Sequence, residues 1–203
     1  LVKRSNGVFG KSGSGKSFLT RILLAGILQH GVATNLVFDM HNEYGWQGNS
    51  ENGYMAKGLK QLFPERVSVF TLDPISSRQR NVAVDHEVRI SLSEVEPSDV
   101  ALLSSLLDIT DFGVDACYRL HEHFGENWIV EFLSIGSNKK SESISDLALR
   151  LQLNTATLQA LYRRLYHIST FKFVSETSRS STIKVLMEHL KSGRHVVLEF
   201  GRW

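Results

Sequence analysis

The chain has 203 residues, of which 42% are hydrophobic and 22% are charged, and its formal net charge is +2. This composition is that of an ordinary folded domain and excludes a disordered or low-complexity chain. The single cysteine, Cys117, excludes an intrachain disulfide and a zinc site built on cysteines, and its apolar helical setting predicts a core residue. The sequence contains neither an apolar run of membrane-spanning length nor the layout of a secretory signal, so we expect a cytoplasmic protein that does not contact membranes.

The first part of the chain alternates between short apolar strands and helical patterns. Between residues 17 and 29, apolar side chains recur at helical spacing, and Gly31 is a natural helix stop. Segments of strand-forming residues lie before and after this helix. In chain order, we predict a buried strand at 7–10, a helix at 17–29, a strand at 33–39, a short helix at 55–63, and strands at 66–72 and 88–92.

Residues 97–190 have a helical pattern almost throughout, and an apolar strand follows at 195–200. Apolar strands that alternate with helices are typical of a mostly parallel sheet covered by helices, which is the α/β class. We therefore expect a sheet-forming core at 1–96, a helical insertion or subdomain at 97–192, and a return strand of the core at 193–203. Because apolar strands stand close to both ends of the chain, we expect this core to be incomplete at both ends, as in a fragment of a longer protein.

Residues 10–17 read GKSGSGKS, which fits the phosphate-binding pattern G-x-x-x-x-G-K-[ST] between a predicted strand and a predicted helix. Glycines let the backbone turn tightly and bring amide N–H groups against phosphate oxygens, and the following helix directs its positive end to the same anion. Lys16 adds a charge for the β- and γ-phosphates, and Ser17 offers a hydroxyl to Mg²⁺. We predict ATP and Mg²⁺ as cofactors, with these nucleotide-binding residues: Gly10, Ser12, Gly13, Ser14, Gly15, Lys16, Ser17 and Phe18.

A second polar motif, DMHNEYGW, occupies residues 39–46 directly after a predicted strand. Ligands of open parallel sheets bind at the carboxyl ends of the strands, so this motif is expected near the phosphate loop if the two strands are neighbours. We predict Lys16 and Glu43 as catalytic residues, and Ser17 and Asp39 as Mg²⁺ ligands, with Asp39 acting through a water molecule. A loop of ordinary polar turn residues is the alternative interpretation of this spacing.

The loop GKSGSGKS, the helix, and a strand that ends in DMHNEY together resemble the HerA-type ATPases of the HerA/FtsK superfamily. The usual segment of that family is close to D-x-H-G-E-Y, and Asn42 stands here in place of its glycine. The resemblance implies a RecA-like P-loop NTPase core in a homo-hexameric ring that moves along double-stranded DNA as it hydrolyses ATP. It also implies a partner, which is either a nuclease of the NurA type in DNA-end processing or an effector in phage defence.

A HerA-type motor also needs a Walker B strand with an acidic pair and an arginine finger, and the sequence contains no convincing Walker B string. The nearest candidate is 196–199, in which three aliphatic residues precede a lone acid, Glu199. We interpret this segment as a strand that precedes the true Walker B strand, which would lie outside these residues. We therefore expect the segment to bind nucleotide weakly and to hydrolyse it poorly.

Two other functions fit the phosphate loop. A small-molecule kinase-like enzyme would need a lid that carries arginines, for which Arg78 and Arg80 are the only hint. A nucleotide-stabilised assembly module without motor activity would keep its partner after the substitution Lys16→Ala abolishes nucleotide binding.

Charge is unevenly distributed along the chain. Residues 139–195 hold ten Lys and Arg against four acids, whereas residues 85–131 hold eleven acids against two arginines. The basic segment could face DNA phosphates or pair with the acidic segment, and the near balance favours pairing. Within the basic segment, residues 144–161 resemble a helix-turn-helix that Arg163 and Arg164 follow. Because no glycine marks the turn, we favour an αα-hairpin whose leucines are buried.

Overall fold

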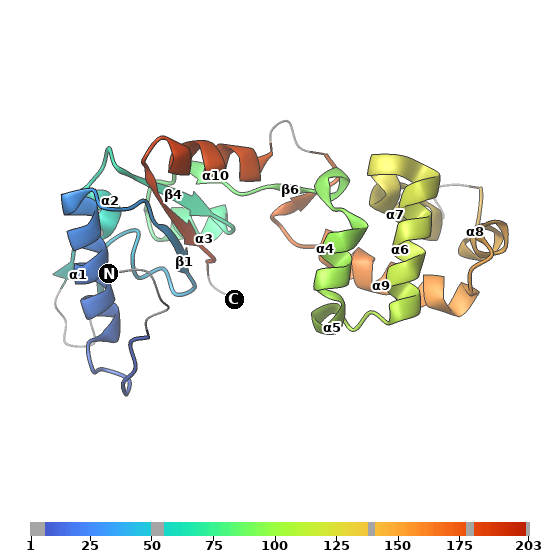
Figure 1. Ribbon diagram of the computed structural model, residues 1–203, viewed down its shortest axis with the longest axis horizontal. Helices are drawn as coiled ribbons and strands as arrows, with labels where there is room; N and C mark the ends of the chain where they lie inside the picture. The colour runs from blue at the N-terminus through green and yellow to red at the C-terminus, as the bar shows by residue number, and fades with distance from the viewer. Residues whose placement is uncertain (1–6, 50–54, 138–140, 178–180, 202–203) are drawn as a thin grey trace. The chain divides into compact units, whose positions relative to one another are not determined.

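Figure 1 shows the computed structural model, which describes residues 7–49, 55–137, 141–177 and 181–201. They form two compact units, of which one comprises Leu1–Val88 with Thr182–Trp203 and the other comprises Arg89–Ser181. The helical subdomain expected at 97–192 differs from the second unit at both boundaries. At the later boundary the physical reason is that helix α10 (Thr182–Lys191) packs against strand β8 of the first unit.

The first unit is built on a four-stranded parallel sheet. Its strands follow the order β1-β8-β4-β5, with the bounds β1 (Leu36–Asp39), β8 (His195–Glu199), β4 (Val67–Thr71) and β5 (His86–Glu87). Every neighbouring pair is parallel, so all four strands end at the same edge of the sheet. At that edge, the register places Glu199 between Asp39 and Thr71. The α/β class predicted from the alternation of elements is confirmed.

Helices cover both faces of this sheet. On one face, the apolar side chains of β4 and β8 pack against α1 (Lys16–His30) and α2 (Leu59–Leu62). On the other face, the ring of His189 in α10 meets the ring of Phe70 at 5.4 Å and shares a 2.8 Å hydrogen bond with the Oγ atom of Ser68. Strand β4 is consequently buried at all its positions, as expected inside a layered α/β core.

The predicted strand at 7–10 is wrong. These residues precede α1 as an irregular segment that pairs with no strand in the described part of the chain, and Phe9 is 93% exposed. Only Val8 and Phe9 are apolar there, and they stand between glycines, which pack no side chain and lose the most backbone entropy on ordering. Two apolar residues do not offset that cost.

Two short elements adjust the prediction between β1 and β4. The helix expected at 55–63 is shorter, because Met55–Ala56 (β3) pairs with Gly48–Asn49 (β2) as an antiparallel ribbon that precedes α2. After β4, the chain forms α3 (Pro74–Gln79), in which Asp73 is the N-cap residue and accepts a 3.0 Å hydrogen bond from the first turn. A proline at the first helical position is the usual start of such a helix.

The second unit consists of helices around one apolar core. Strand β6 (Ile90–Ser91) pairs with β7 (Val174–Ser175), so the strand predicted at 88–92 is found only at these two residues, and β5 ends before it at Glu87. In chain order its helices are η1 (Leu92–Glu94), α4 (Pro97–Leu102), α5 (Ser104–Leu107), α6 (Asp111–Phe124), η2 (Gly125–Asn127), α7 (Trp128–Gly136), α8 (Ile144–Leu151) and α9 (Thr155–Ser169). Within the described ranges, no helix combines the length and the apolar character that crossing a membrane requires.

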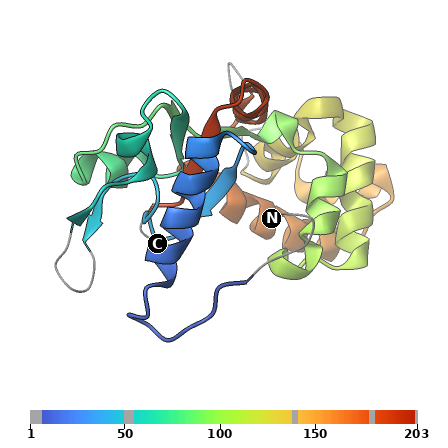
Figure 2. The ribbon, with the colours of Figure 1, turned by 60° about the vertical axis from the view of Figure 1, so that its left-hand side comes forward.

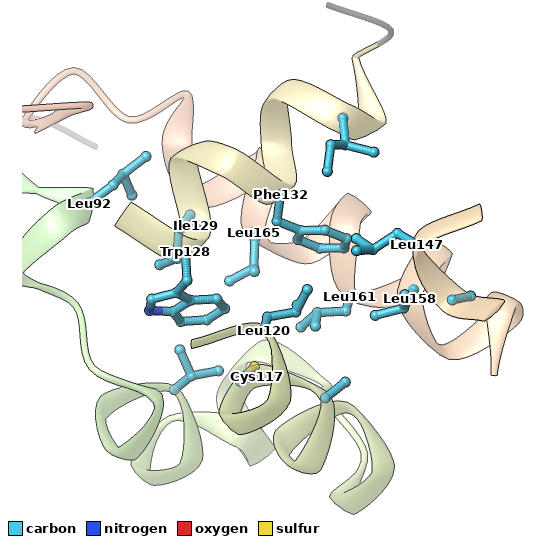
Figure 3. Packing of buried hydrophobic residues seen from close by; sticks show 14 residues of the cluster. Leu92, Cys117, Leu120, Trp128, Ile129, Phe132, Leu147, Leu158, Leu161 and Leu165 are labelled. Atoms are coloured by element: carbon cyan, nitrogen blue, oxygen red, sulfur yellow. The ribbon is translucent and has the colours of Figure 1, made fainter. Parts of the chain in front are cut away.

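Figure 3 shows the core of this unit, in which Trp128 and Phe132 of α7 lie among leucines of α6, α8 and α9. Cys117 of α6 is fully buried there, which confirms its predicted place in the core. Burial raises the pKa of the Cys117 thiol to about 12, because a thiolate would lose its hydration among these side chains.

Helices α8 and α9 form the αα-hairpin that the sequence favours. Gln152 ends α8 in the left-handed conformation, with φ of 54°, so the turn is made without a glycine. Asn154 caps α9 by accepting backbone N–H groups at 2.8 and 3.2 Å. Arg164 of α9 pairs with Asp108, which joins the basic and acidic segments. The predicted core leucines of the hairpin are fully or largely buried: Leu147, Leu151, Leu158, Leu161 and Leu165.

Candidate functional site

The phosphate loop at 10–17 leads into α1, as the dark blue segment of Figure 2 shows, and its residues are largely exposed. Gly13 and Gly15 have left-handed backbones, with φ of 74° and 85°, which residues with side chains rarely adopt. A Cβ atom on Gly10 would lie 2.5 Å from the Oγ atom of Ser14. The conformation of this loop therefore requires glycine at positions 13 and 15.

The N-terminal end of α1 has the properties of an anion site. Gly15 caps the helix without a side-chain hydrogen bond, and the first turn contains no acidic residue. Amide N–H groups of a first helical turn have no partner within the helix, and the helix dipole adds positive potential at the same place. Together with the glycine-formed cradle, this end of α1 fits the polyphosphate of ATP.

Lys16 is folded back onto the loop. Its Nζ atom donates a 2.7 Å hydrogen bond to the carbonyl oxygen of Lys11, which also accepts the backbone N–H of Ser14 at 3.3 Å. A phosphate oxygen carries negative charge and is a stronger acceptor for an ammonium group than a carbonyl oxygen is. Ser17 follows at the start of α1 and is half-buried, whereas the ring of Phe18 is 59% exposed.

Asp39 ends β1 and is fully buried. One of its carboxylate oxygens accepts the backbone N–H of Glu43 at 2.8 Å, and the other accepts those of Tyr44 and Gly45 at 2.8 and 3.3 Å. These bonds fold the motif at 39–46 into a fixed loop at the carboxyl edge of the sheet. The Mg²⁺ role of Asp39 stays a prediction. Both of its carboxylate oxygens already accept hydrogen bonds from loop amides, so they would have to keep these bonds while they bind water at the cation.

The conformation of Asn42 shows why asparagine can stand at the glycine position of D-x-H-G-E-Y. Its backbone is left-handed, with φ of 56°, a conformation that glycine adopts freely and asparagine tolerates better than most residues. Its side-chain amide also donates to the carbonyl oxygen of Gly201 at 3.1 Å and accepts the N–H of Gly201 at 3.3 Å. The substitution therefore keeps the required backbone and adds a link between the loop and the segment after β8.

Glu43 is held by its backbone on both sides. Its N–H bonds to Asp39, and its carbonyl oxygen accepts a hydrogen bond from the Nη2 atom of Arg21 in α1. The Nη1 atom of the same guanidinium group donates to the carbonyl oxygen of Ala56 at 3.4 Å. The carboxylate of Glu43 is half-buried and, among the described residues, forms neither a hydrogen bond nor an ion pair. The loop thus presents a free carboxylate on a fixed backbone.

Beside Asp39 lies an ion pair that joins β8 to Arg80, the residue that follows α3. The Oε2 atom of Glu199 is 2.5 Å from the Nη2 atom of Arg80, and Glu199 is fully buried. Burial raises the pKa of the Glu199 carboxyl and the negative charge of Asp39 adds to this, while the bond to Arg80 opposes it. A Cβ atom on Gly45 would lie 2.7 Å from the other carboxylate oxygen of Glu199. The loop at 39–46, here called the acidic loop, therefore packs directly against this ion pair.

Sequence reasoning misses the pairing of Glu199 with Arg80, because the two residues are 119 positions apart. The sequence places Glu199 in a doubtful Walker B string and Arg80 in a kinase-like lid, and no local pattern connects them. The available signal was a carboxylate at the end of an apolar strand, which predicts a charge at the edge of the sheet.

The predicted site residues fall into two groups. Asp39 and Glu43 share one loop, whereas Lys16 and Ser17 lie at the start of α1. A hydrogen bond from Arg21 in α1 to Glu43 joins the helix to the loop, and Tyr44 of the loop also packs on the apolar cluster that contains Leu28 of α1.

A glycine-formed loop at a helix N-terminus, next to a parallel sheet whose carboxyl edge carries acidic side chains, defines a P-loop NTPase-like core. The chain belongs to the family described as Helicase HerA, central domain, whose model matches residues 1–202. Neither the curated proteins nor the solved structures contain a match to the chain. The resemblance found in the sequence is confirmed, and the chain is a domain of the ATPase and helicase type, for which ATP is the implied nucleotide.

Proposed function

We propose that the protein hydrolyses ATP and couples hydrolysis to movement along double-stranded DNA as one subunit of a hexameric ring. The observation that carries the ATP-binding part is the phosphate loop, in which Gly13 and Gly15 have left-handed backbones and which leads into a helix N-terminus without a side-chain cap. Support for the DNA and ring parts comes from membership of the HerA central-domain family. By the same reasoning, we propose a cytoplasmic location and a partner that is a NurA-type nuclease or a defence effector.

Each residue of the loop has a distinct part in this proposal. Bound ATP with Mg²⁺ would supply the phosphoanhydride bond and a charge-neutralising cation. Lys16 leaves the carbonyl oxygen of Lys11 and places its ammonium group against the phosphate oxygens. The loop and first-turn amides donate to the same oxygens, and the hydroxyl of Ser17 binds the cation.

The acidic loop contributes to the attacking water. Glu43 has a free carboxylate on a backbone held from β1 and from α1, so it can accept a hydrogen bond from a water molecule without moving the loop. Asp39 assists only through water, because its oxygens already accept three backbone N–H groups. We place the main water-activating acid and the arginine finger beyond residues 1–203.

Nucleotide titration of the 203-residue chain tests the binding part of the proposal. Calorimetry with ATP and Mg²⁺ is expected to show binding that Lys16→Ala abolishes, while the control Lys184→Ala, at an exposed position of α10, leaves the affinity unchanged. Equal affinities of the two variants would refute the assignment of the loop. In the full-length protein, hydrolysis stimulated by double-stranded DNA tests the motor part, and its absence would refute movement on DNA.

A nucleotide-stabilised assembly module is the second candidate. It predicts that Lys16→Ala leaves partner binding intact in the full-length protein while nucleotide affinity is lost. The kinase-like candidate loses one of its two arginines, because Arg80 is engaged with buried Glu199. Arg78 is an exposed arginine 3.6 Å from Glu87.

A further inference from the structure

We propose that Arg21 is a positioning residue, which sets the place of Glu43 relative to the phosphate loop. This inference rests on the proposed function, since it assigns a purpose to the contact between the two halves of that site. Arg21 lies on α1, the same rigid helix that begins with Lys16 and Ser17. Its Nη2 atom donates to the carbonyl oxygen of Glu43.

The hydrogen bond from Arg21 is the second one that holds the backbone of Glu43. Asp39 already holds the N–H of Glu43 from the end of β1. With Arg21 on the carbonyl oxygen, the backbone on both sides of the Glu43 side chain is tied, once to the sheet and once to α1. The position of Glu43 is therefore coupled through this hydrogen bond to the helix that begins with Lys16 and Ser17.

The chemistry of Arg21 suits this task. Its planar fork donates from Nη2 to Glu43 and from Nη1 to Ala56, so one side chain ties α1 to the acidic loop and to β3. Among the described residues, Arg21 contacts carbonyl oxygens and no carboxylate. Since the guanidinium group binds backbone alone, the Glu43 carboxylate is left free for water.

Steady-state ATP hydrolysis by the full-length protein tests the proposal with Arg21→Met, Arg21→Lys, Glu43→Gln and the double variant Arg21→Met/Glu43→Gln. Misplacement of a catalytic group by about 1 Å can cost roughly a hundredfold in rate, so Arg21→Met is expected to lower kcat by about tenfold to a hundredfold. KM for ATP should change less than about twofold, because the phosphate loop is untouched. Arg21→Lys restores part of kcat, since one ammonium group still reaches one carbonyl oxygen.

The double variant is the decisive measurement. If Arg21 acts through Glu43, the double variant loses no more kcat than Glu43→Gln alone. Multiplicative losses, or an unchanged kcat in Arg21→Met, overturn the inference while leaving the proposed function standing. An unchanged kcat in Glu43→Gln overturns the inference together with the role of Glu43, and nucleotide titration of Lys16→Ala then judges the phosphate loop separately.

Hydrogen exchange of the same full-length proteins distinguishes positioning from general stability. Arg21→Met should speed amide exchange at Glu43–Gly45 and leave the amides of β4 and β8 unchanged. Faster exchange throughout the first unit would mean that Arg21 merely holds the fold, and would overturn the inference. The matched control is Arg78→Met, an exposed arginine of α3, which should change neither kcat nor exchange in the loop.

Discussion

The side-chain amide of Asn42 forms hydrogen bonds with both backbone groups of Gly201: it donates to the carbonyl oxygen at 3.1 Å and accepts the N–H at 3.3 Å. The loop that carries Glu43 is thereby joined to the segment after β8, although 159 positions of sequence separate the two residues. A glycine at position 42 would supply the left-handed backbone but not this link. Each such link between distant segments contributes on the order of 1 kcal/mol.

Substitutions at Asn42 separate its two roles. Asn42→Gly keeps the backbone conformation and loses the two bonds to Gly201, so we expect a loss of about 1 kcal/mol in the free energy of unfolding. Asn42→Ala also loses tolerance of positive φ, which adds roughly 1 kcal/mol. Urea unfolding of the 203-residue chain measures both. If alanine were no worse than glycine, the left-handed backbone would not be the constraint at this position.

The pair of Arg80 and Glu199 predicts a pH-dependent loss of stability. Arg80→Met leaves Glu199 buried without its counter-charge, which typically costs about 3 kcal/mol near neutral pH. In acid, Glu199 is protonated and the variant should approach the wild type. Urea unfolding at neutral pH and near pH 5 provides the comparison, with Arg78→Met at an exposed ion pair as a control that changes stability little. Equal losses at both pH values would indicate that Arg80 contributes packing alone.

Glu199 itself gives the chain a stability that declines as pH rises. Its folded pKa is raised above the ordinary value of 4.5, so the folded state retains a proton that the unfolded chain releases first. This contribution is complete below about pH 4.5 and is lost as pH rises through the folded pKa. Glu199→Gln should therefore unfold with a shallower decline over that window. An unchanged slope would place the titration on other groups.

Two glycines of the first unit should respond to alanine in opposite ways. Gly15→Ala forces a side chain into a backbone with φ of 85° at the cap of α1, so we expect weaker nucleotide binding and a loss of about 1 kcal/mol. Gly26→Ala lies inside α1, where an added Cβ atom meets nothing within 4 Å, so helix propensity should raise stability by about 0.5–1 kcal/mol. Calorimetric titration and urea unfolding measure the two effects. Reversed signs would contradict the conformation of the loop.

Cys117 should be inert in the folded chain. Its thiol is fully buried and has its pKa raised to about 12, so neither the thiolate nor access for a reagent is available at pH 8. Labelling with a thiol reagent should proceed only as the second unit opens, and its rate should rise with added urea. Rapid labelling in the absence of denaturant would contradict the packing of α6.

Several elements of both units could be predicted from local patterns. The glycine-rich loop, the helix up to Gly31, the strand β4 and the αα-hairpin depend on neighbours in sequence, and each was found close to its predicted place. The strand at 7–10 was wrong because two apolar residues suggested burial where no strand pairs with them. A local pattern reports the tendency to be buried and not whether a partner strand exists.

The candidate site could be predicted only as far as single residues. The motif at 39–46 points to Asp39 and Glu43, but the contacts with Arg21, Arg80 and Gly201 depend on strand order and register. Because β8 lies between β1 and β4, Glu199 meets Asp39 across a pairing that no local spacing reveals. The substitution of glycine by Asn42 was visible in the sequence, and its physical reason required the backbone angle.

The strand order also determines which unit can fold first while the chain is being synthesised. Strands β1 and β4 pair with β8 and not with each other, so the centre of the sheet cannot form until β8 has left the ribosome. The helical unit, whose contacts are complete at Ser181, is free to fold before that moment. Nascent chains in which Ser181 has left the ribosome and His195 has not should consequently carry a protease-resistant helical unit and an open, protease-sensitive ATPase half.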